Sequence, residues 1–305
     1  MAEEARIGRR AWAAGVILAA VLAGVIGPLV IHLGQKRHNR LEWDVQARFP
    51  PHQRIAGGEV FATTVVAVMQ HELDGATGWR PNDFFLWGPG LWADNNANRQ
   101  LGILQAVRES MRVFKDHLTK VSSNEYDPNL VTADTAFRND AEKFWLPSAE
   151  SRIRQGIRDL RSYVDGLQTD PPRSKPINQR NIELIRLFQA WSDLLGDAHA
   201  SLYRDTESIW RTDDNFYHAQ GFAHAMHYLV GAVAREYQHE FENKPVMHSL
   251  FHEVADALHK AALMKPLIVF DGSPDGLFAN HRRNLDAYIT EARQKMYSIR
   301  EELEK

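Results

Sequence analysis

The stretch DNFYHAQGFAHAMHYLVGAV, residues 214–233, shows the helical period on which the fold depends. At about 100° per residue, its large apolar side chains fall together on one helical face. His224 and His227 point largely away from that face, and His218 lies at its edge. The end of the stretch, residues 229–234, is apolar all round, which leaves room for a second buried face. The apolar face comprises Phe222, Met226, Leu229, Val233 and Tyr237.

The same period recurs along most of the chain, and no strand-like alternation persists. The sequence therefore predicts an all-α fold, with the helices packed as a bundle. One predicted helix carries Phe137, Phe144 and Trp145 and stops at Pro147. The other helices of the body are predicted at about 58–73, 101–118, 153–164, 182–195, 213–242, 245–265 and 285–303.

Composition excludes several classes of protein. The 305 residues carry 36 Lys and Arg against 39 Asp and Glu, a net charge of −3, so we expect no nucleic-acid partner. The chain has no Cys, which excludes disulfides, cysteine-ligated zinc, iron–sulfur clusters and thiol nucleophiles. It also lacks a serine-hydrolase elbow, a phosphate-binding loop and a dinucleotide-binding glycine pattern, so we expect no cofactor.

A long uncharged run stands near the start of the chain. It extends from Ala11 to Ile31, and roughly 20 apolar residues suffice to cross a bilayer as a helix. No small-residue cleavage site follows it, so the sequence predicts an uncleaved single-pass anchor at 11–33 after a short tail at 1–10. A short tail ahead of a large body is the usual geometry of an anchor with a cytoplasmic N-terminus, so we expect the body outside the cytoplasm, which for a bacterial inner membrane is the periplasm.

Four small residues recur at every fourth position of this run and form one stripe. Such a stripe allows two membrane helices to approach closely, which would make a homo-oligomer through the anchor. The alternative is that glycine and alanine are simply common in membrane helices. The stripe consists of Gly15, Ala19, Ala23 and Gly27.

The rest of the chain divides into a juxtamembrane linker at 34–55 and an α-helical body at 56–305. The proline-rich segment at 170–176 is the best internal break. It either separates two helical subdomains or forms one long loop of a bundle.

Histidines in the 245–265 helix suggest a metal site. His248 and His252 are four residues apart, a spacing at which two imidazoles can bind zinc, and Asp256 lies on the same side. The pattern lacks the glutamate that follows the first histidine in helical metalloproteases. The competing interpretation, which we favour, is a polar helix face or a helix–helix contact.

Two loops combine aromatic, glycine and polar residues in an unusual way, at 78–102 and 269–284. Either they bind a partner or ligand, or their aromatic side chains anchor the loops themselves, which is the commoner case. Asp94, Asn95 or Asn96 would cap the helix after the first loop, and Asn280 the last helix. The candidate binding residues are Trp79, Asn82, Asp83, Trp87, Trp92, Asp94, Asn95, Asn280 and His281.

Four stretches, GWRPNDFF, DNNANRQLG, FYHAQGFAHAM and DGSPDGLFANHRRNLDAYITEAR, together resemble a bacterial membrane family called domain of unknown function 2333. They occupy residues 78–85, 94–102, 216–226 and 271–293 in that order. The resemblance covers nearly the whole chain and implies an inner-membrane protein with one anchor. It brings no activity and no catalytic residues.

Three functions remain open from the sequence. The leading hypothesis is a membrane-anchored helical scaffold or interaction protein of the bacterial envelope, with a membrane or envelope protein as partner. The second is a metal-dependent envelope enzyme that uses the histidine-bearing helix. The third is a protein that binds a lipid or a cell-wall ligand through the aromatic loop.

Overall fold

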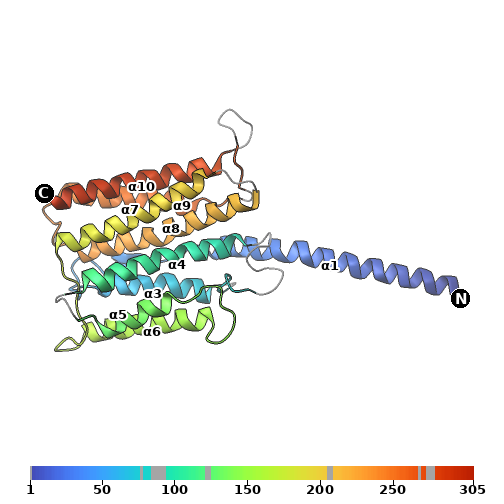
Figure 1. Cartoon of the computed structure of the whole chain (residues 1–305), viewed down its shortest axis with the longest axis horizontal. Coiled ribbons are helices and arrows are strands. Elements are labelled where there is room, and N and C mark those ends of the chain that lie inside the picture. The colour runs from blue at the N-terminus through green and yellow to red at the C-terminus, as the bar shows by residue number, and fades with distance from the viewer. Residues whose placement is uncertain are drawn as a thin grey trace.

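A computed structural model of the whole chain shows helices joined by loops (Figure 1). Among the described residues there are no strands beyond one isolated bridge between Asp271 and Asn280, so the all-α prediction is confirmed. The described residues are 2–75, 78–83, 94–120, 125–204, 209–266, 269–272 and 279–305. Within them, only the backbone is described at 2–7, 25, 27–29, 31, 32, 35–38 and 209–211.

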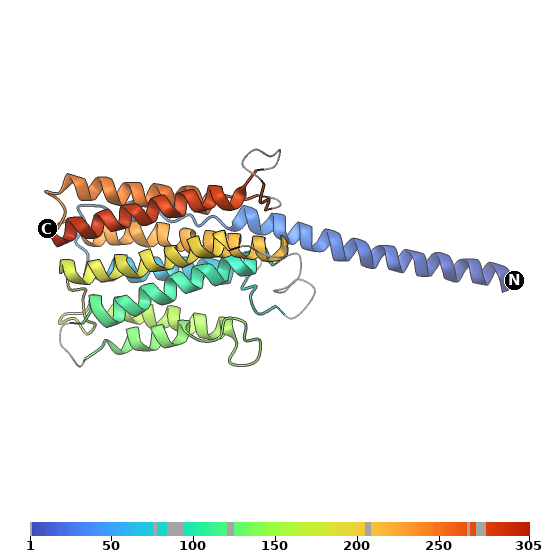
Figure 2. The ribbon, with the colours of Figure 1, turned by 45° about the horizontal axis from the view of Figure 1, so that its top comes forward.

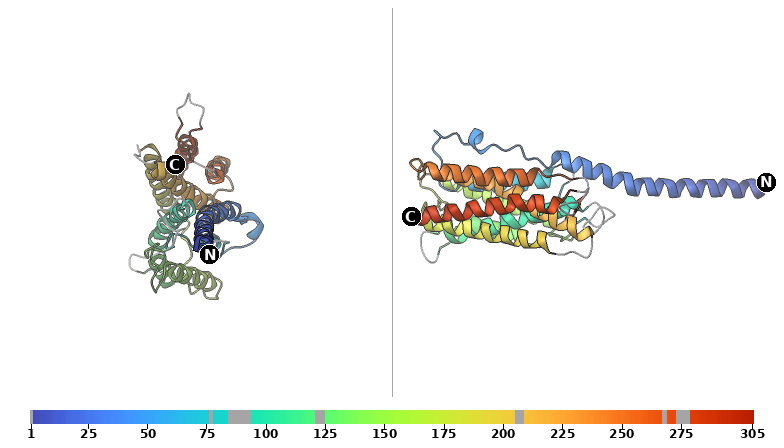
Figure 3. Two further views of the ribbon diagram at one scale, coloured as in Figure 1. Left: turned by 90° about the vertical axis from the view of Figure 1, so that its right-hand side faces the viewer. Right: turned by 90° about the horizontal axis from the view of Figure 1, so that it is seen from above.

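The helices of the body lie side by side along one direction, and α1 leaves the bundle at one end (Figures 1 and 2). The C-terminus lies at the opposite end, as the view from above also shows (Figure 3). The described elements are α1 (Ala2–His38), α2 (Val45–Arg48), α3 (Glu59–Asp74), α4 (Asn95–Val113), the π-helical turn η1 (Phe114–Leu118), α5 (Pro128–Phe137), α6 (Ala149–Leu167), α7 (Asn181–Tyr203), α8 (Ile209–Glu236), α9 (Pro245–Leu263) and α10 (His281–Glu304).

Helix α8 lies at the centre of the body, in contact with α3, α4, α7 and α9. Its predicted apolar face is buried, and so are residues on its other sides, including Ala223, Val230 and Ala232. The second buried face that the sequence allowed is therefore present. His224, which the helical period placed away from the apolar face, is buried as well, because α8 is surrounded by helices.

Two glycines let α4 and α8 pack with their backbones in contact. A Cβ added at Gly102 would lie 2.1 Å from the carbonyl oxygen of His218. A Cβ added at Gly221 would lie 2.1 Å from the carbonyl oxygen of Arg99. Any larger residue would force the helices apart, so this crossing requires glycine on both sides.

The predicted helix through Phe144 and Trp145 is wrong. Helix α5 ends at Phe137, and residues 138–148 form a loop. The side chain of Asn139 accepts a hydrogen bond from the backbone N–H of Asp140 (3.0 Å), and Asp140 accepts one from Glu142 (3.0 Å). Such local bonds compete with helical ones, and they turn the chain at this point.

Helix α1 projects from the bundle along most of its length (Figures 1 and 2). Among the described residues, no helix combines the length and the apolar character needed to cross a membrane. In the small-residue stripe, a Cβ at Gly15 would meet nothing within 4 Å, and Ala19 and Ala23 are exposed. The surroundings of Gly27 lie outside the described residues.

The segment at 170–176 is a loop tied to its neighbours. The Tyr163 hydroxyl donates to the carbonyl of Lys175 (2.7 Å), and the N–H of Ile177 donates to the carbonyl of Gly57 (3.0 Å). One continuous cluster of buried apolar residues includes members from both sides of the loop. The division into two subdomains stays a prediction.

Glu236, at the end of α8, caps the start of α3. Its carboxylate accepts hydrogen bonds from the N–H groups of Gly58 and Phe61, both at 3.0 Å. Burial raises the pKa of Glu236 to about 7, although these hydrogen bonds act in the other direction. The side chain thus keeps a proton in the folded protein at pH values where the unfolded chain has lost it.

We expect the free energy of unfolding to fall as the pH rises from about 4.5 to about 7. In that window the folded state binds more protons than the unfolded state, so stability decreases with pH, by roughly 2–3 kcal/mol. The Glu236→Gln variant should lose this part of the pH dependence. Urea unfolding in detergent, at a series of pH values, measures both proteins. Parallel pH profiles for the two would contradict the assignment.

Candidate binding groove

Residues 39–54 run from the end of α1 across the surface of α8, and we call them the strap. The Tyr228 hydroxyl of α8 donates to the carbonyl of Leu41 (2.7 Å). The indole N–H of Trp43 donates to the Thr64 hydroxyl of α3 (3.3 Å). The sequence predicted only a juxtamembrane linker here, but the segment is held against the body.

Arg235 fixes the far end of the strap. Its Nε donates to the carbonyl of Phe49 (2.7 Å), and its Nη2 donates to the carbonyls of Pro50 (2.8 Å) and Gln53 (2.7 Å). The guanidinium is buried, and three carbonyl oxygens replace part of its hydration. Phe49 is buried too, so both polar and apolar contacts attach the strap to α8.

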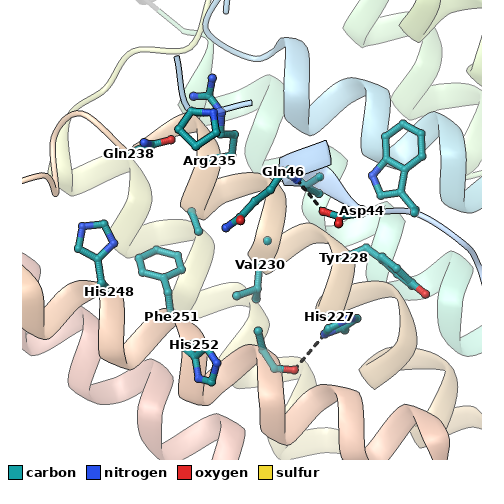
Figure 4. Close-up of a pocket in the computed structure, with 16 residues that line it drawn as sticks. Asp44, Gln46, His227, Tyr228, Val230, Arg235, Gln238, His248, Phe251 and His252 are labelled. Atoms are coloured by element: carbon teal, nitrogen blue, oxygen red, sulfur yellow. Dashed lines mark hydrogen bonds between the residues drawn. The ribbon is translucent and has the colours of Figure 1, made fainter. Parts of the chain in front are cut away.

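A groove lies between the strap, α8 and α9 (Figure 4), with a volume of about 580 Å³. This size is within the usual range for ligand sites, and such sites combine an apolar floor with a few polar groups. Polar side chains on its walls include Gln46, Gln238 and His252. The apolar part comes from Val45, Val230, Gly231, Ala234, Phe251 and Ala255.

His227 lines the groove in a defined protonation form. Its Nδ1 lies 2.9 Å from the carbonyl oxygen of Ala255, which can only accept, so Nδ1 carries the proton. Burial lowers the pKa of His227, with a further lowering by His259, whose ring centroid lies 4.7 Å away. The side chain is therefore neutral at pH 7, and Nε2 has a lone pair to offer.

The two histidines of the predicted metal site, His248 and His252, both line this groove. Asp256, the third predicted ligand, forms an ion pair with Lys260 (2.6 Å) instead. Within the part of the chain that the structure describes, no three acidic, histidine or cysteine side chains come close enough to hold a metal ion. The metal site stays a prediction.

The described residues of the first candidate loop hold structure together. Trp79 is buried and its Nε1 donates to the carbonyl of Ala141 (2.9 Å). Asn82 is also buried and donates to the Glu150 carboxylate (2.9 Å), while Asp83 pairs with Arg80. Their contacts agree with the interpretation in which loop side chains anchor the loops. Trp87 and Trp92 lie outside the described residues.

The remaining candidates lie at helix starts. Asp94 is the N-cap residue of α4, but its side chain makes no capping hydrogen bond to the helix. Asn95, the first residue of α4, is buried. Asn280 caps α10 by accepting from the N–H of Arg283 (2.9 Å), as predicted. The Nδ1 of His281 accepts a hydrogen bond from the N–H of Phe270 (3.0 Å), which ties that residue to the start of α10.

A buried ion pair lies at the end of the bundle where α1 joins it. Arg99 of α4 donates two bonds to the Glu72 carboxylate of α3, at 2.9 and 3.0 Å, and one to the carbonyl of Asn39 (3.0 Å). Gln100 adds a bond to Glu72 (3.2 Å). Helical periodicity does not predict this pair, because its members lie 27 residues apart along the chain.

Comparison with known proteins identifies one family. The profile described as an uncharacterized protein conserved in bacteria, domain of unknown function 2333, matches residues 7–204 and 193–305. The chain belongs to this family. Neither the curated proteins nor the solved structures contain a match.

In this member of the 2333 family, two motif stretches meet at the contact between α4 and α8. Gly102 belongs to one stretch and Gly221 to the other, and each faces the other helix's backbone. Asn98 of α4 donates to Asp214 of α8 (2.6 Å) beside them. The stretches thus hold residues that the packing of this chain requires.

Proposed function

We propose that this chain is a membrane-anchored interaction protein of the bacterial envelope, whose body binds a protein partner in the groove. In this proposal α1 spans the inner membrane, the N-terminus is cytoplasmic and the body is periplasmic. The observation that carries the proposal is the exposure of α1.

Apolar side chains of α1 are exposed all around the helix, outside the bundle. A helix that is apolar on every side is unstable in water and needs a bilayer or a large partner surface. At 1.5 Å per residue, the uncharged run has about the length that a bilayer core requires. The exposed residues include Trp12, Ile17, Leu18, Val21, Ile26 and Val30.

The groove supports the second half of the proposal. The strap that forms one wall continues directly from α1, so the groove lies at a set place relative to the anchor. Its wall combines the exposed His252 with apolar residues, a mixture that suits a peptide segment with apolar side chains.

The experiment is photo-crosslinking in membranes washed with alkaline carbonate. A photoreactive amino acid replaces His252, at the groove, or Ala287, an exposed residue of α10. We expect the full chain to stay in the membrane pellet and to form a discrete protein adduct from position 252 but not from 287. An Ala255→Arg substitution should fill the groove and reduce the yield of the adduct about tenfold. A tenfold loss of affinity corresponds to ~1.4 kcal/mol of binding free energy.

The membrane anchor and the binding groove are disproved by different results. Release of the chain into the carbonate wash would disprove the anchor. Equal labelling from positions 252 and 287, in a chain that remains in the pellet, would disprove the groove as the binding site.

A further inference from the structure

The loop between α5 and α6 carries three consecutive apolar side chains that face solvent. Phe144 is 50% exposed, Trp145 is 74% exposed and Leu146 is 89% exposed. The rings of Phe144 and Trp145 pack edge to face, with centroids 5.4 Å apart. We call residues 144–146 the apolar tip. A contiguous apolar group of this kind on a surface usually marks a site of contact.

Hydrogen bonds from the body hold the loop just before the apolar tip, and one further bond closes the loop behind it. Trp79 binds the carbonyl of Ala141 (2.9 Å), and Asn82 binds the carbonyl of Lys143 (3.3 Å). The N–H of Ala149 also donates to the carbonyl of Lys143 (2.9 Å), which closes the loop behind the tip. These hydrogen bonds hold the loop backbone in a position that leaves the three side chains exposed.

The loop lies at the end of the bundle from which α1 departs (Figures 1 and 2). Helices α5 and α6 run along the bundle, and the chain turns between them at this end. If α1 spans a bilayer, the membrane surface faces the same end of the body. The apolar tip and the anchor then approach one membrane from the same side.

We propose that the apolar tip inserts into the interfacial layer of the bilayer that α1 spans, as a second and shallower membrane contact. The inference rests on the proposed anchor. Tryptophan prefers the headgroup level, where its ring is in an apolar environment and its N–H can reach water or a lipid oxygen. Phe144 and Leu146 supply apolar area beside it. Lys143, next to the tip and partly exposed, has a charge that suits anionic headgroups.

Because the chain has no cysteine, a single introduced cysteine can be labelled at one chosen position. Leu146→Cys, which keeps Phe144 and Trp145, receives an environment-sensitive fluorophore in the full chain. Arg173→Cys, exposed in the loop between α6 and α7 at the other end of the bundle, is the matched control. Both proteins are placed in lipid nanodiscs of mixed phosphatidylcholine and phosphatidylglycerol, with and without bromine on the acyl chains near the headgroup.

We expect bromolipid to quench the label at position 146 about threefold more than the label at 173, because an interfacial segment lies only ~5–10 Å into the boundary. Adding Trp145→Asp to the Leu146→Cys protein should remove most of that difference. This second variant changes only an exposed residue, so the bundle itself should stay folded.

Each other outcome overturns the proposal in a recognisable way. A chain that enters nanodiscs but shows equal, weak quenching at both positions refutes the tip and leaves the anchor standing. A blue-shifted label at 146 without quenching places the apolar tip against protein, such as a second copy. A chain that fails to enter nanodiscs at all refutes the anchor and the tip together.

Discussion

Replacement of Gly221 by alanine should prevent the native packing of the bundle, whereas replacement of Gly231 in the same helix should not. A Cβ at Gly221 would lie 2.1 Å from a backbone carbonyl oxygen of α4, which has no flexible end to move aside. At Gly231 the nearest atom is a methyl carbon of Val45 at 3.8 Å, an ordinary contact. We expect Gly221→Ala to lower the free energy of unfolding by about 3 kcal/mol, the upper part of the usual range for overpacking, because a backbone carbonyl cannot move aside.

The two variants form a matched pair, because both add one methyl group to the middle of α8. Gly231→Ala should be neutral or stabilising by up to about 1 kcal/mol, since alanine favours helix. Urea unfolding followed by circular dichroism in detergent gives both values. If Gly221→Ala were as stable as Gly231→Ala, the close crossing of α4 and α8 would be incorrect.

Replacement of Arg99 by methionine should be the second severe change. Arg99 and Glu72 are both almost fully buried, with 2% and 3% of their side chains exposed. The variant leaves the Glu72 carboxylate buried without its cation, and removal of one partner from such a pair costs about 3–5 kcal/mol. It also removes the bond to Asn39 that joins α4 to the start of the strap.

A double-mutant cycle with Glu72→Gln isolates the pair. Glu72→Gln in the Arg99→Met background should cost much less than in the wild type, with a coupling energy of about 2 kcal/mol or more. Strictly additive losses would show that the two side chains do not depend on each other. Arg154 and Asp74, an exposed pair at 2.9 Å, provide the control, because such surface pairs contribute at most about 1 kcal/mol.

Helical periodicity predicted most of the body, because an amphipathic helix repeats its apolar residues at a fixed interval. It placed α3, α6 and α10 within a few residues of their observed limits. The prediction was wrong at Phe144 and Trp145, where apolar residues continue but Asn139 and Asp140 turn the chain. Periodicity records which residues are apolar, and it does not register side chains that bond to their own backbone.

The candidate site was predicted only in part. His248 and His252 were predicted as metal ligands, and both line the groove. The strap was not foreseen, because its contacts join Phe49 and Pro50 to Arg235, which is far away in the sequence. The Glu72–Arg99 pair was missed for the same reason, since one sequence carries no signal for contacts between distant charged residues.

The attachment of the strap has a mechanical consequence. Because Arg235 and Tyr228 hold the strap along α8, tension applied to α1 would load the central helix of the bundle rather than a loose tether. A partner seated against the strap would pull on that same helix. The hydrogen bonds to Leu41 and Phe49 therefore place α1 and the groove on one line of force through the body.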